Sequence, residues 1–449
     1  MRTITAAQSA VYATTTSARS THVKVEIYNS SQWRELTNLD VGNNGVGINF
    51  VKSVNWSSSL GSPITEATVT CVRQILNFNL SPHITSGLRY TSLCAVSAQI
   101  RISAAVMPLG AIPESSDYML LFRGTISRYD IDGNSITLRC RDEMAALADA
   151  FIENTGTEYG NGVKEVNEVI QDILTQWGGG VTLYSTNGDG TPAFDAADLL
   201  GWVIRKYTQD RVPVMDAIRS LSDQAYADLR YKWQTVTGDL KLVLYRPERT
   251  APASLRTFTI DQFRTKSCGL NMLDIRNFIR VGYFKGEDKA AQREYVDADS
   301  AASITLYGRR WMEINEELTS NIKDSTEAQE MADAIVSDLA DPKLTMSVDM
   351  PFFPNVELAD YYTFAADDLY YSTAQAVSVV SFSHTIDAKG GFTQMNVEGV
   401  PKSRSTRAWL RNQAVHQKRQ VGTKNLASFS SVSDSLMFNG DLGHWSNGG

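Results

Sequence analysis

The chain contains many short segments in which apolar and polar residues alternate, and these segments constrain its fold more than any other feature. Val23, Val25 and Ile27 alternate with Lys24 and Glu26, so a pleated strand here would bury one of its faces. Further strand-like runs cover residues 68–72, 99–105, 118–128, 135–140, 277–283, 344–350, 361–364, 376–384 and 392–397. The pattern predicts antiparallel β structure in both the first and the last third of the chain.

The middle of the chain changes to a helical period. Residues 141–153 have apolar side chains at helical spacing after Asp142, a candidate N-cap, and residues 163–177 form a second apolar stripe that ends at three glycines. A third helix is predicted from Pro213 to Ala225, followed by a hairpin with strands at 229–236 and 240–245 around a turn at 237–239. The clearest helix signal, opened by Asp324, covers residues 324–341.

These patterns predict an α+β fold that is predominantly β, with two antiparallel β-barrel domains separated by an α+β insert. A length of 449 residues suits two to four domains, at about 100–200 residues per domain. The predicted segments are an N-terminal arm (1–21), a first β domain (22–141), the insert (142–265), a second β domain with a crossing helix (266–400) and a basic extension (401–449). No short-period repeat is visible, and the two β regions are candidate distant duplicates.

The charges are distributed unevenly. Between residues 402 and 424 all charged side chains are basic, whereas the rest of the chain carries 35 basic and 50 acidic residues. An acidic body argues against a sequence-reading nucleic-acid protein, which needs a basic face to neutralise phosphates. The basic segment is either a solvated linker or a surface that docks on an acidic neighbour or on DNA. Its candidate docking residues are Lys402, Arg404, Arg407, Trp409, Arg411, Lys418, Arg419 and Lys424.

No motif in the sequence predicts a catalytic, cofactor-binding or metal-ligating residue, and we expect no cofactor. Residues 130–134 resemble the start of a calcium loop, but Ser135 and Arg141 replace the glycine and the glutamate that such a loop requires, so a hairpin turn is the better interpretation. Asp360, Asp367 and Asp368 suit turns better than catalysis. The four cysteines are far apart, and we expect them to be buried thiols. They are Cys71, Cys94, Cys140 and Cys268.

Neither a membrane-spanning segment nor a secretory signal is predicted. The longest nearly unbroken apolar run, residues 199–204, is much shorter than the ~20 residues of a spanning helix. Residues 1–21 lack an apolar block behind a basic start. We therefore expect a product that stays where it is made.

Several short stretches, taken in order, resemble the baseplate hub or tail hub proteins of tailed bacteriophages, including the late control protein D family. The N-terminal stretches are Phe122-Arg123-Gly124-Thr125-Ile126 and Ile136-Thr137-Leu138-Arg139-Cys140-Arg141-Asp142. The insert carries Val214-Met215-Asp216-Ala217-Ile218 and Asp228-Leu229-Arg230-Tyr231. The later stretches are Asp274-Ile275-Arg276-Asn277, Tyr307-Gly308-Arg309-Arg310 and Val356-Glu357-Leu358-Ala359-Asp360. The resemblance covers roughly residues 22–400.

The resemblance implies a structural protein and not an enzyme. It implies a homotrimer in which each copy supplies two tail-tube-like barrels, so that three copies form a ring of pseudo-sixfold symmetry. Such a ring joins the tail tube or distal tail protein to a central fibre or spike protein, lies near the tape measure protein, and leaves a channel through which phage DNA passes without sequence-specific binding. The expected location is the tail tip or baseplate of the virion, after assembly in the host cytoplasm.

Two other functions compete with the hub. A carbohydrate-binding tail adhesin is suggested by the aromatic and turn residues at 438–445 and by eight tryptophans, because sugars stack on aromatic rings. A tail-associated enzyme that degrades the cell wall has weaker support, since only scattered carboxylates are available to it. A bacterial outer-membrane barrel is disfavoured by the missing signal and by the amphipathic helices.

Overall fold

The computed structural model describes most of the chain up to residue 399. The described residues are 19–29, 32–40, 47–60, 62–75, 78–83, 93–153, 158–159, 164–183, 203–204, 207–208, 211–224, 227–233, 240–245, 254–285, 292–314, 322 and 325–399. Everything said below about structure concerns these residues.

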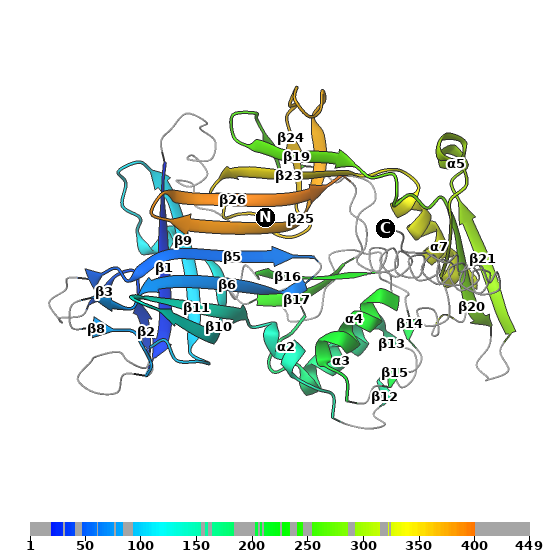
Figure 1. Cartoon of the computed structure of the whole chain (residues 1–449). Helices are drawn as coiled ribbons and strands as arrows, with labels where there is room; N and C mark the ends of the chain where they lie inside the picture. The colour runs from blue at the N-terminus through cyan, green and yellow to red at the C-terminus, as the bar shows by residue number, and fades with distance from the viewer. Residues whose placement is uncertain are drawn as a thin grey trace, which may run out of the picture. The chain divides into compact units, whose positions relative to one another are not determined.

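Thirteen strands of the described chain form one sheet (Figure 1). The N-terminal β region supplies β1 (Arg19–Asn29), β2 (Gln32–Glu35), β5 (Val51–Ser59), β6 (Ser62–Val72), β9 (Gln99–Pro108), β10 (Met119–Asp132) and β11 (Ser135–Asp142). The later β region supplies β18 (Arg256–Phe258), β19 (Arg264–Leu270), β23 (Leu344–Pro351), β24 (Tyr361–Phe364), β25 (Gln375–Asp387) and β26 (Gly390–Glu398). Short elements flank them: β3 (Leu39–Asp40), β4 (Gly47–Ile48), β7 (Gln74–Ile75), β8 (Phe78–Asn79) and the 3₁₀ turn η1 (Ser115–Asp117).

The two β regions are joined edge to edge. The strand order is β19-β23-β26-β25-β5-β6-β11-β10-β9-β1-β2, with β24 and β18 added beside β25. The joint is an antiparallel pairing of β25 with β5, in which Ser381 lies opposite Ser59 and Ile386 opposite Val54; Figure 1 shows the two strands side by side. Residues from both regions, among them Val25, Trp56 and Val397, belong to one hydrophobic cluster. The two regions therefore share a core.

The two halves of the sheet repeat the same arrangement. The order β5-β6-β11-β10-β9 in the first half corresponds to β19-β23-β26-β25-β24 in the second. The β10–β11 pairing shifts register after Ile126, and the β25–β26 pairing shifts after Val379. Just before β9 and β24 stand Ser97 and Ala359, which have φ angles of 70° and 63° that non-glycine residues rarely adopt. These matching details support the expected duplication.

The insert has a hydrophobic core of its own. It contains α2 (Ala145–Asp149), α3 (Val166–Trp177), α4 (Val214–Gln224) and the hairpin β16 (Asp228–Trp233) and β17 (Leu240–Tyr245). Its two-residue strands are β12 (Glu158–Tyr159), β13 (Lys164–Glu165), β14 (Val203–Ile204) and β15 (Tyr207–Thr208). The apolar stripe of α3 packs with α4 and with Leu242 of β17, all within one cluster. Gly178, Gly179 and Gly180 follow α3 as predicted, and the last two have positive φ.

A small module interrupts the second half of the sheet between β19 and β23. It consists of β20 (Phe278–Lys285), β21 (Gln292–Asp299), α5 (Ala301–Tyr307), β22 (Trp311–Ile314) and α7 (Ser325–Leu339). β20 lies between the other two strands, and α7 packs on β20 and β21 (Figure 1). The predicted strand at 277–283 and helix at 324–341 are confirmed, but the helix lies on this small sheet and does not cross the large one.

Two local predictions are wrong. The helix predicted over 141–153 is only the five residues of α2, because β11 continues to Asp142 and the Asp142 carboxylate accepts hydrogen bonds from the backbone N–H groups of Thr65 and Met144. Cys268 is only partly buried, because it lies in the edge strand β19, whereas the other three cysteines are buried; none of the four forms a disulfide. The hairpin turn at 237–239 and the segments 1–18 and 401–449 lie outside the described residues.

The predicted fold class is confirmed: the chain is mostly antiparallel β, with an α+β insert. Strand pairing over the described residues runs through both β regions as one sheet and closes no barrel. The trimeric assembly and the five domain boundaries stay predictions.

Asp142 links the sheet to the insert and generates a pH-dependent prediction. Burial raises the pKa of its carboxyl to about 7, although the N–H groups of Thr65 and Met144 partly offset this. An unfolded aspartate titrates near ~4, so the folded protein holds this proton more tightly between the two values. Stability should therefore fall as pH rises through that window. Between pH 5 and pH 8, we expect the free energy of unfolding to fall by roughly 2–3 kcal/mol less in Asp142→Asn than in the native chain.

Urea unfolding of the native chain and of Asp142→Asn, followed by tryptophan fluorescence at both pH values, measures this difference directly. All other ionisable groups are the same in the two proteins, so their contributions cancel in the comparison. An equal change in the two free energies of unfolding would contradict the assignment.

Trp56 tests whether the two β regions share one core. Its ring lies 4.7 Å from the His384 ring and 5.9 Å from the Phe352 ring, between centroids, and its side chain is buried. Trp56→Ala should lower the free energy of unfolding by about 3–5 kcal/mol, because it leaves a cavity. Trp311→Ala is the matched control, since Trp311 is 53% exposed and should cost less than ~1 kcal/mol. If chemical denaturation gave equal losses of free energy of unfolding for Trp56→Ala and Trp311→Ala, the shared core would be contradicted.

Candidate assembly site

The structure does not describe the docking residues that the sequence predicts. Lys402, Arg404, Arg407, Trp409, Arg411, Lys418, Arg419 and Lys424 lie outside the described residues, as does the aromatic segment 438–445 of the adhesin alternative. Their docking role stays a prediction. The described part of the chain presents other candidate surfaces.

Three carboxylates considered for metal binding or catalysis, Asp130, Asp360 and Asp367, have structural roles. Asp130 forms ion pairs with Arg128 and Arg139 on the hairpin that was expected at 130–134. Asp360 is buried and accepts hydrogen bonds from the Tyr362 hydroxyl at 2.9 Å and the Glu357 N–H at 3.0 Å. Asp367 closes a turn by accepting from the Leu369 N–H, and Asp368 is exposed. Among the described residues, no histidine, cysteine and carboxylate cluster could hold a metal ion.

The joint between the two β regions is a sheet interface with a buried and an exposed face. On the buried face, the ring of His384 packs on Trp56 and bonds through Nδ1 to the Thr393 hydroxyl at 2.9 Å. On the other face, the Asn55 amide donates to the Thr385 hydroxyl at 2.7 Å across the joint. The interface thus combines backbone pairing, apolar burial and a polar rim, as interfaces between separate proteins do.

Several motifs of the tail-hub resemblance meet at contacts between segments. Arg230 of β16 donates to the Leu358 carbonyl at 2.8 Å, and Tyr231 shares a hydrogen bond with Ser58 of β5, so the insert is fastened beside the joint. The Asn277 amide donates to the Gly308 carbonyl at 2.8 Å and accepts from the Arg310 N–H at 2.7 Å. These contacts give the motif residues a role in assembling the chain.

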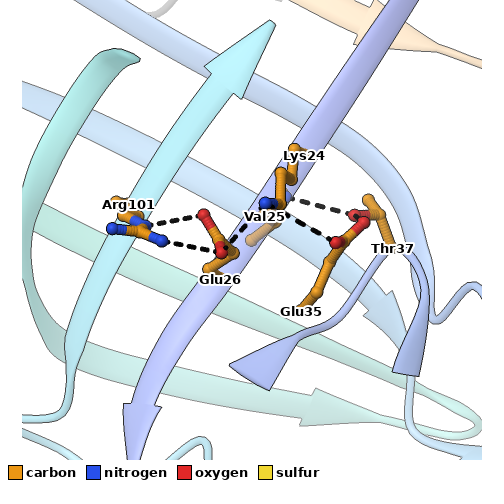
Figure 2. Close-up of polar contacts among 6 residues, drawn as sticks. All are labelled: Lys24, Val25, Glu26, Glu35, Thr37 and Arg101. Carbon is orange, nitrogen blue, oxygen red and sulfur yellow. Dashed lines mark hydrogen bonds and ion pairs between the residues drawn. The ribbon is translucent and has the colours of Figure 1, made fainter. Parts of the chain in front are cut away.

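A charged cluster fixes β2 at one end of the large sheet (Figure 2). Arg101 of β9 donates two hydrogen bonds to the Glu26 carboxylate of β1, at 2.6 and 2.8 Å, and Lys24 lies 3.2 Å from the same group. The Arg101 guanidinium also lies 4.4 Å from the centre of the Trp33 ring on β2. Side chains from three neighbouring strands are thus held together.

The Glu26 carboxyl is ionised at neutral pH because of these partners. Burial raises its pKa, but the hydrogen bond and charge of Arg101 and the charge of Lys24 outweigh burial, so the pKa lies below its usual value. An ion pair in this partly buried setting is sensitive to the loss of either member, since the remaining charge stays poorly solvated.

An open hollow of about 800 Å³ lies between the first half of the sheet and the insert. Its lining is rich in charged side chains, and four of these form two pairs: Arg123 donates to Glu143 at 2.9 Å, and Arg141 donates to Asp149 at 3.1 Å. Lys241 donates to the Thr182 hydroxyl at 2.7 Å. The floor passes close to Gly124, where a Cβ atom would lie 2.0 Å from the Arg141 carbonyl oxygen. Among the described residues, the charged side chains that line the hollow therefore serve contacts within the fold.

Several strand edges of the large sheet have no strand partner among the described residues, and two of them occupy matching places in the two halves. One is the outer edge of β19, which pairs only with β23. The other is the end of β10 after Ile126, where pairing with β9 stops while pairing with β11 continues to Asp132. Unpaired edges expose backbone donors and acceptors that another strand can bind. The sequence predicted neither β19 nor the last residues of β10, since the strand run predicted there ends at residue 128. Open edges have no local signal either, because they depend on pairing between distant segments.

Comparison by sequence gives no family model that matches the chain and no match among curated proteins. Comparison by structure does give matches. The 43 kDa tail protein of prophage MuSo2 from Shewanella oneidensis has a TM-score of 0.52 at 11% identity, over 84% of this chain and 98% of that one. The tail protein from Neisseria meningitidis MC58 has a TM-score of 0.50 at 11% identity, over 86% and 99%.

The chain has the fold of a phage tail protein. A chain of the Francisella PdpA–VgrG complex shares this tail-protein fold at a TM-score of 0.50 and 9% identity, over 85% of this chain and 53% of that chain. The resemblance seen in the sequence is confirmed at the level of the fold. No helix among the described residues is both long enough and apolar enough to span a membrane.

The charged cluster at β2 generates a third prediction. Glu26→Gln should lower the free energy of unfolding by roughly 1–3 kcal/mol at pH 7, because Arg101 loses its charged partner. The lowered pKa stabilises the folded state above the unfolded value of about 4.3, and this contribution is lost as pH falls through the folded pKa. The difference in free energy of unfolding between the native chain and Glu26→Gln should therefore shrink at acid pH.

Denaturant unfolding at pH 7 and near pH 3 measures the gap. Glu66→Gln is the matched control, because Glu66 is an exposed carboxylate on β6 and should change stability little at either pH. A loss for Glu26→Gln that is the same at both pH values would rule out the ion pair as its cause.

Proposed function

We propose that the chain is a structural baseplate hub protein of a phage tail, forming a homotrimeric ring that joins the sixfold tail tube to a trimeric fibre or spike. The observation that carries this proposal is the internal duplication, in which two halves of equal strand order are joined edge to edge. Three copies with two halves each would present six similar halves to a sixfold tube. The same ring would present three identical chains to a trimeric fibre. The tail-protein fold supports the same reading.

The joint between the halves explains how such a ring can close. An interface between two different edges is heterologous, and repeated heterologous contacts form a ring when the rotation between units permits. Here the first such contact is already made inside the chain, between β25 and β5. A ring of copies needs only a second contact of the same kind.

The charge of the chain suits a channel for DNA. The sequence outside the basic segment 402–424 is acidic, and like charges repel the phosphate backbone, so DNA would slide through a ring lined by this body without binding. We propose transient passage of phage DNA and no sequence-specific contact. The basic segment is then free to dock on a neighbouring tail protein.

The proposed partners follow from the position of a hub. They are two further copies of the chain, the tail tube or distal tail protein on one side, the central fibre or spike protein on the other, and the tape measure protein in the channel. The proposed location is the tail tip or baseplate of the virion, reached by assembly in the host cytoplasm. The proposed role is structural and not enzymatic; in support, Asp130, Asp360 and Asp367 are engaged in ion pairs and turns.

Negative-stain electron microscopy of the purified full chain, with two-dimensional averaging and a mass measurement of the same sample, tests the proposal. We expect rings of threefold symmetry with an open centre and the mass of three 49.6 kDa chains. A solid particle without a channel, in isolation and also after addition of the tail tube protein, would exclude the hub. Glycan-array binding and cell-wall zymography of the same sample test the adhesin and enzyme alternatives.

A further inference from the structure

The internal joint and the two open edges belong to one repeating pattern. Within the chain, the end of β25 that follows Val379 pairs with β5, the first strand of the other half. The corresponding end of β10 follows Ile126, and the corresponding first strand is β19. Each of these pairs on one side only, with β11 or with β23, and its other edge has no strand partner among the described residues. The joint uses the end of β25 from the second half and β5 from the first half. The counterparts of these two edges, the end of β10 and β19, remain open.

Residue rows across the sheet define which positions correspond. In the first half, Ile126 lies opposite Cys140, Cys140 opposite Ala67, and Ala67 opposite Trp56. The equivalent row in the second half runs through Val379, Val397, Met346 and Cys268. Cys268 of β19 thus corresponds to Trp56 of β5.

The partner of Trp56 in the joint is His384, five residues after Val379. Five residues after Ile126 stands Ile131. By the same count, Tyr129 corresponds to Phe382 and Leu270 corresponds to Ser58. Phe382 and Ser58 lie opposite each other in the joint. The pattern leaves one set of positions to be filled: a strand opposite β19 and a strand opposite the end of β10.

The residues of the internal joint are more buried than the corresponding residues at the open edges of β10 and β19. A strand missing from the open edges would account for this difference. In the joint, His384 is 1% exposed and Trp56 is 2% exposed. At the open edges, Ile131 is 37% exposed and Leu270 is 64% exposed, and both are apolar. Tyr129 and Cys268 are also only partly buried, yet both pack against the shared core. Apolar side chains that face the core side of a sheet but remain half covered mark an interface.

We propose that a second copy of this chain pairs its β19 antiparallel with residues 127–132 of β10, with Ile131 opposite Cys268, Asp130 opposite Gly269 and Tyr129 opposite Leu270. This inference deepens the proposed ring, on which it rests, by naming the two strands and the register of the contact between copies. The large sheet then continues from one copy into the next.

The chemistry of the two edges is complementary in this register. Tyr129 and Ile131 share a face with Leu270 and Cys268, because residues opposite each other in a pleated pair project to the same side. In this register Asp132 lies opposite Ser267, next to Lys266 in the sequence of β19. No two like charges lie directly opposite each other. Pairing also satisfies the edge of β19, which otherwise remains a template for aggregation.

A single substitution can test the register, because Cys268 is a natural free thiol. Opposed residues of an antiparallel pair have Cα atoms about 4.5–5.5 Å apart, within the range that a disulfide spans. Mild oxidation of full-length Ile131→Cys at alkaline pH should link each copy to Cys268 of the next. We expect covalent dimers and then a closed covalent trimer on a non-reducing gel, with few linked chains in the native protein.

Asp132→Cys is the matched control, since it lies one residue further along the strand and projects to the opposite face. It should link several-fold less than Ile131→Cys. Combining Ile131→Cys with Cys268→Ser should remove the linked species, because Cys71, Cys94 and Cys140 are buried. Burial also raises the pKa of Cys94 to about 12, which keeps that thiol unreactive.

A second pair of variants tests the contact without oxidation. Leu270→Asp should raise the dissociation constant of the assembly about tenfold or more, because a charge replaces an apolar side chain that the contact buries. Leu306→Asp is the control, since Leu306 is 72% exposed on α5 and lies outside the contact. Mass photometry over a dilution series measures both.

The outcomes separate this inference from the proposed function. Rings that assemble but do not link through Ile131→Cys, or link equally through Asp132→Cys, would overturn the strand pairing while leaving the hub in place. A chain that stays monomeric and unlinked at every concentration would overturn both. Linked trimers together with weakened assembly of Leu270→Asp support both.

Discussion

The antiparallel pairing of β25 with β5 is the constraint on which the rest of the structure depends. A strand edge inside a protein must satisfy its N–H and C=O groups, and here two halves of one chain do so for each other. The pairing brings Trp56, Phe352 and His384 together and merges two sets of apolar side chains into one core. It also positions Ser58 and Leu358 to receive Tyr231 and Arg230 of the insert. Without this joint, neither half would have a complete core.

The elements could be predicted from the sequence because their signals are local. Alternation around Val25 predicts β1, the apolar stripe that ends before Gly178 predicts α3, and the apolar spacing within residues 324–341 predicts α7. The length of α2 could not be predicted in this way, because the Asp142 carboxylate that resembled a helix cap also binds the Thr65 N–H, which lies 77 residues away in the sequence. A side chain that serves two segments at once gives the same local signal as one that serves a single segment.

The candidate site was harder to predict than the fold. The joint pairs Ser381 with Ser59, and nothing in either strand distinguishes an edge that meets the other half from an edge that stays open. The two positive-φ residues that mark the duplication are Ser97 and Ala359, so no glycine pattern shows them. The resembling motifs were informative in order and spacing, but the structure shows that Asn277 and Arg230 hold segments together. A motif can thus identify a fold through residues whose role is to build it.

The small module between β19 and β23 has a mechanical consequence. It takes the place of a hairpin turn, leaving β19 at Leu270 and re-entering β23 at Leu344, and these two residues lie opposite each other. A pull on the module in the direction of β19 and β23 therefore draws both strands along their own length. The hydrogen bonds between β23 and β26 then bear the load in shear, all together, and do not open one after another from an end. A force applied at the module along these strands thus loads many hydrogen bonds of the sheet at once.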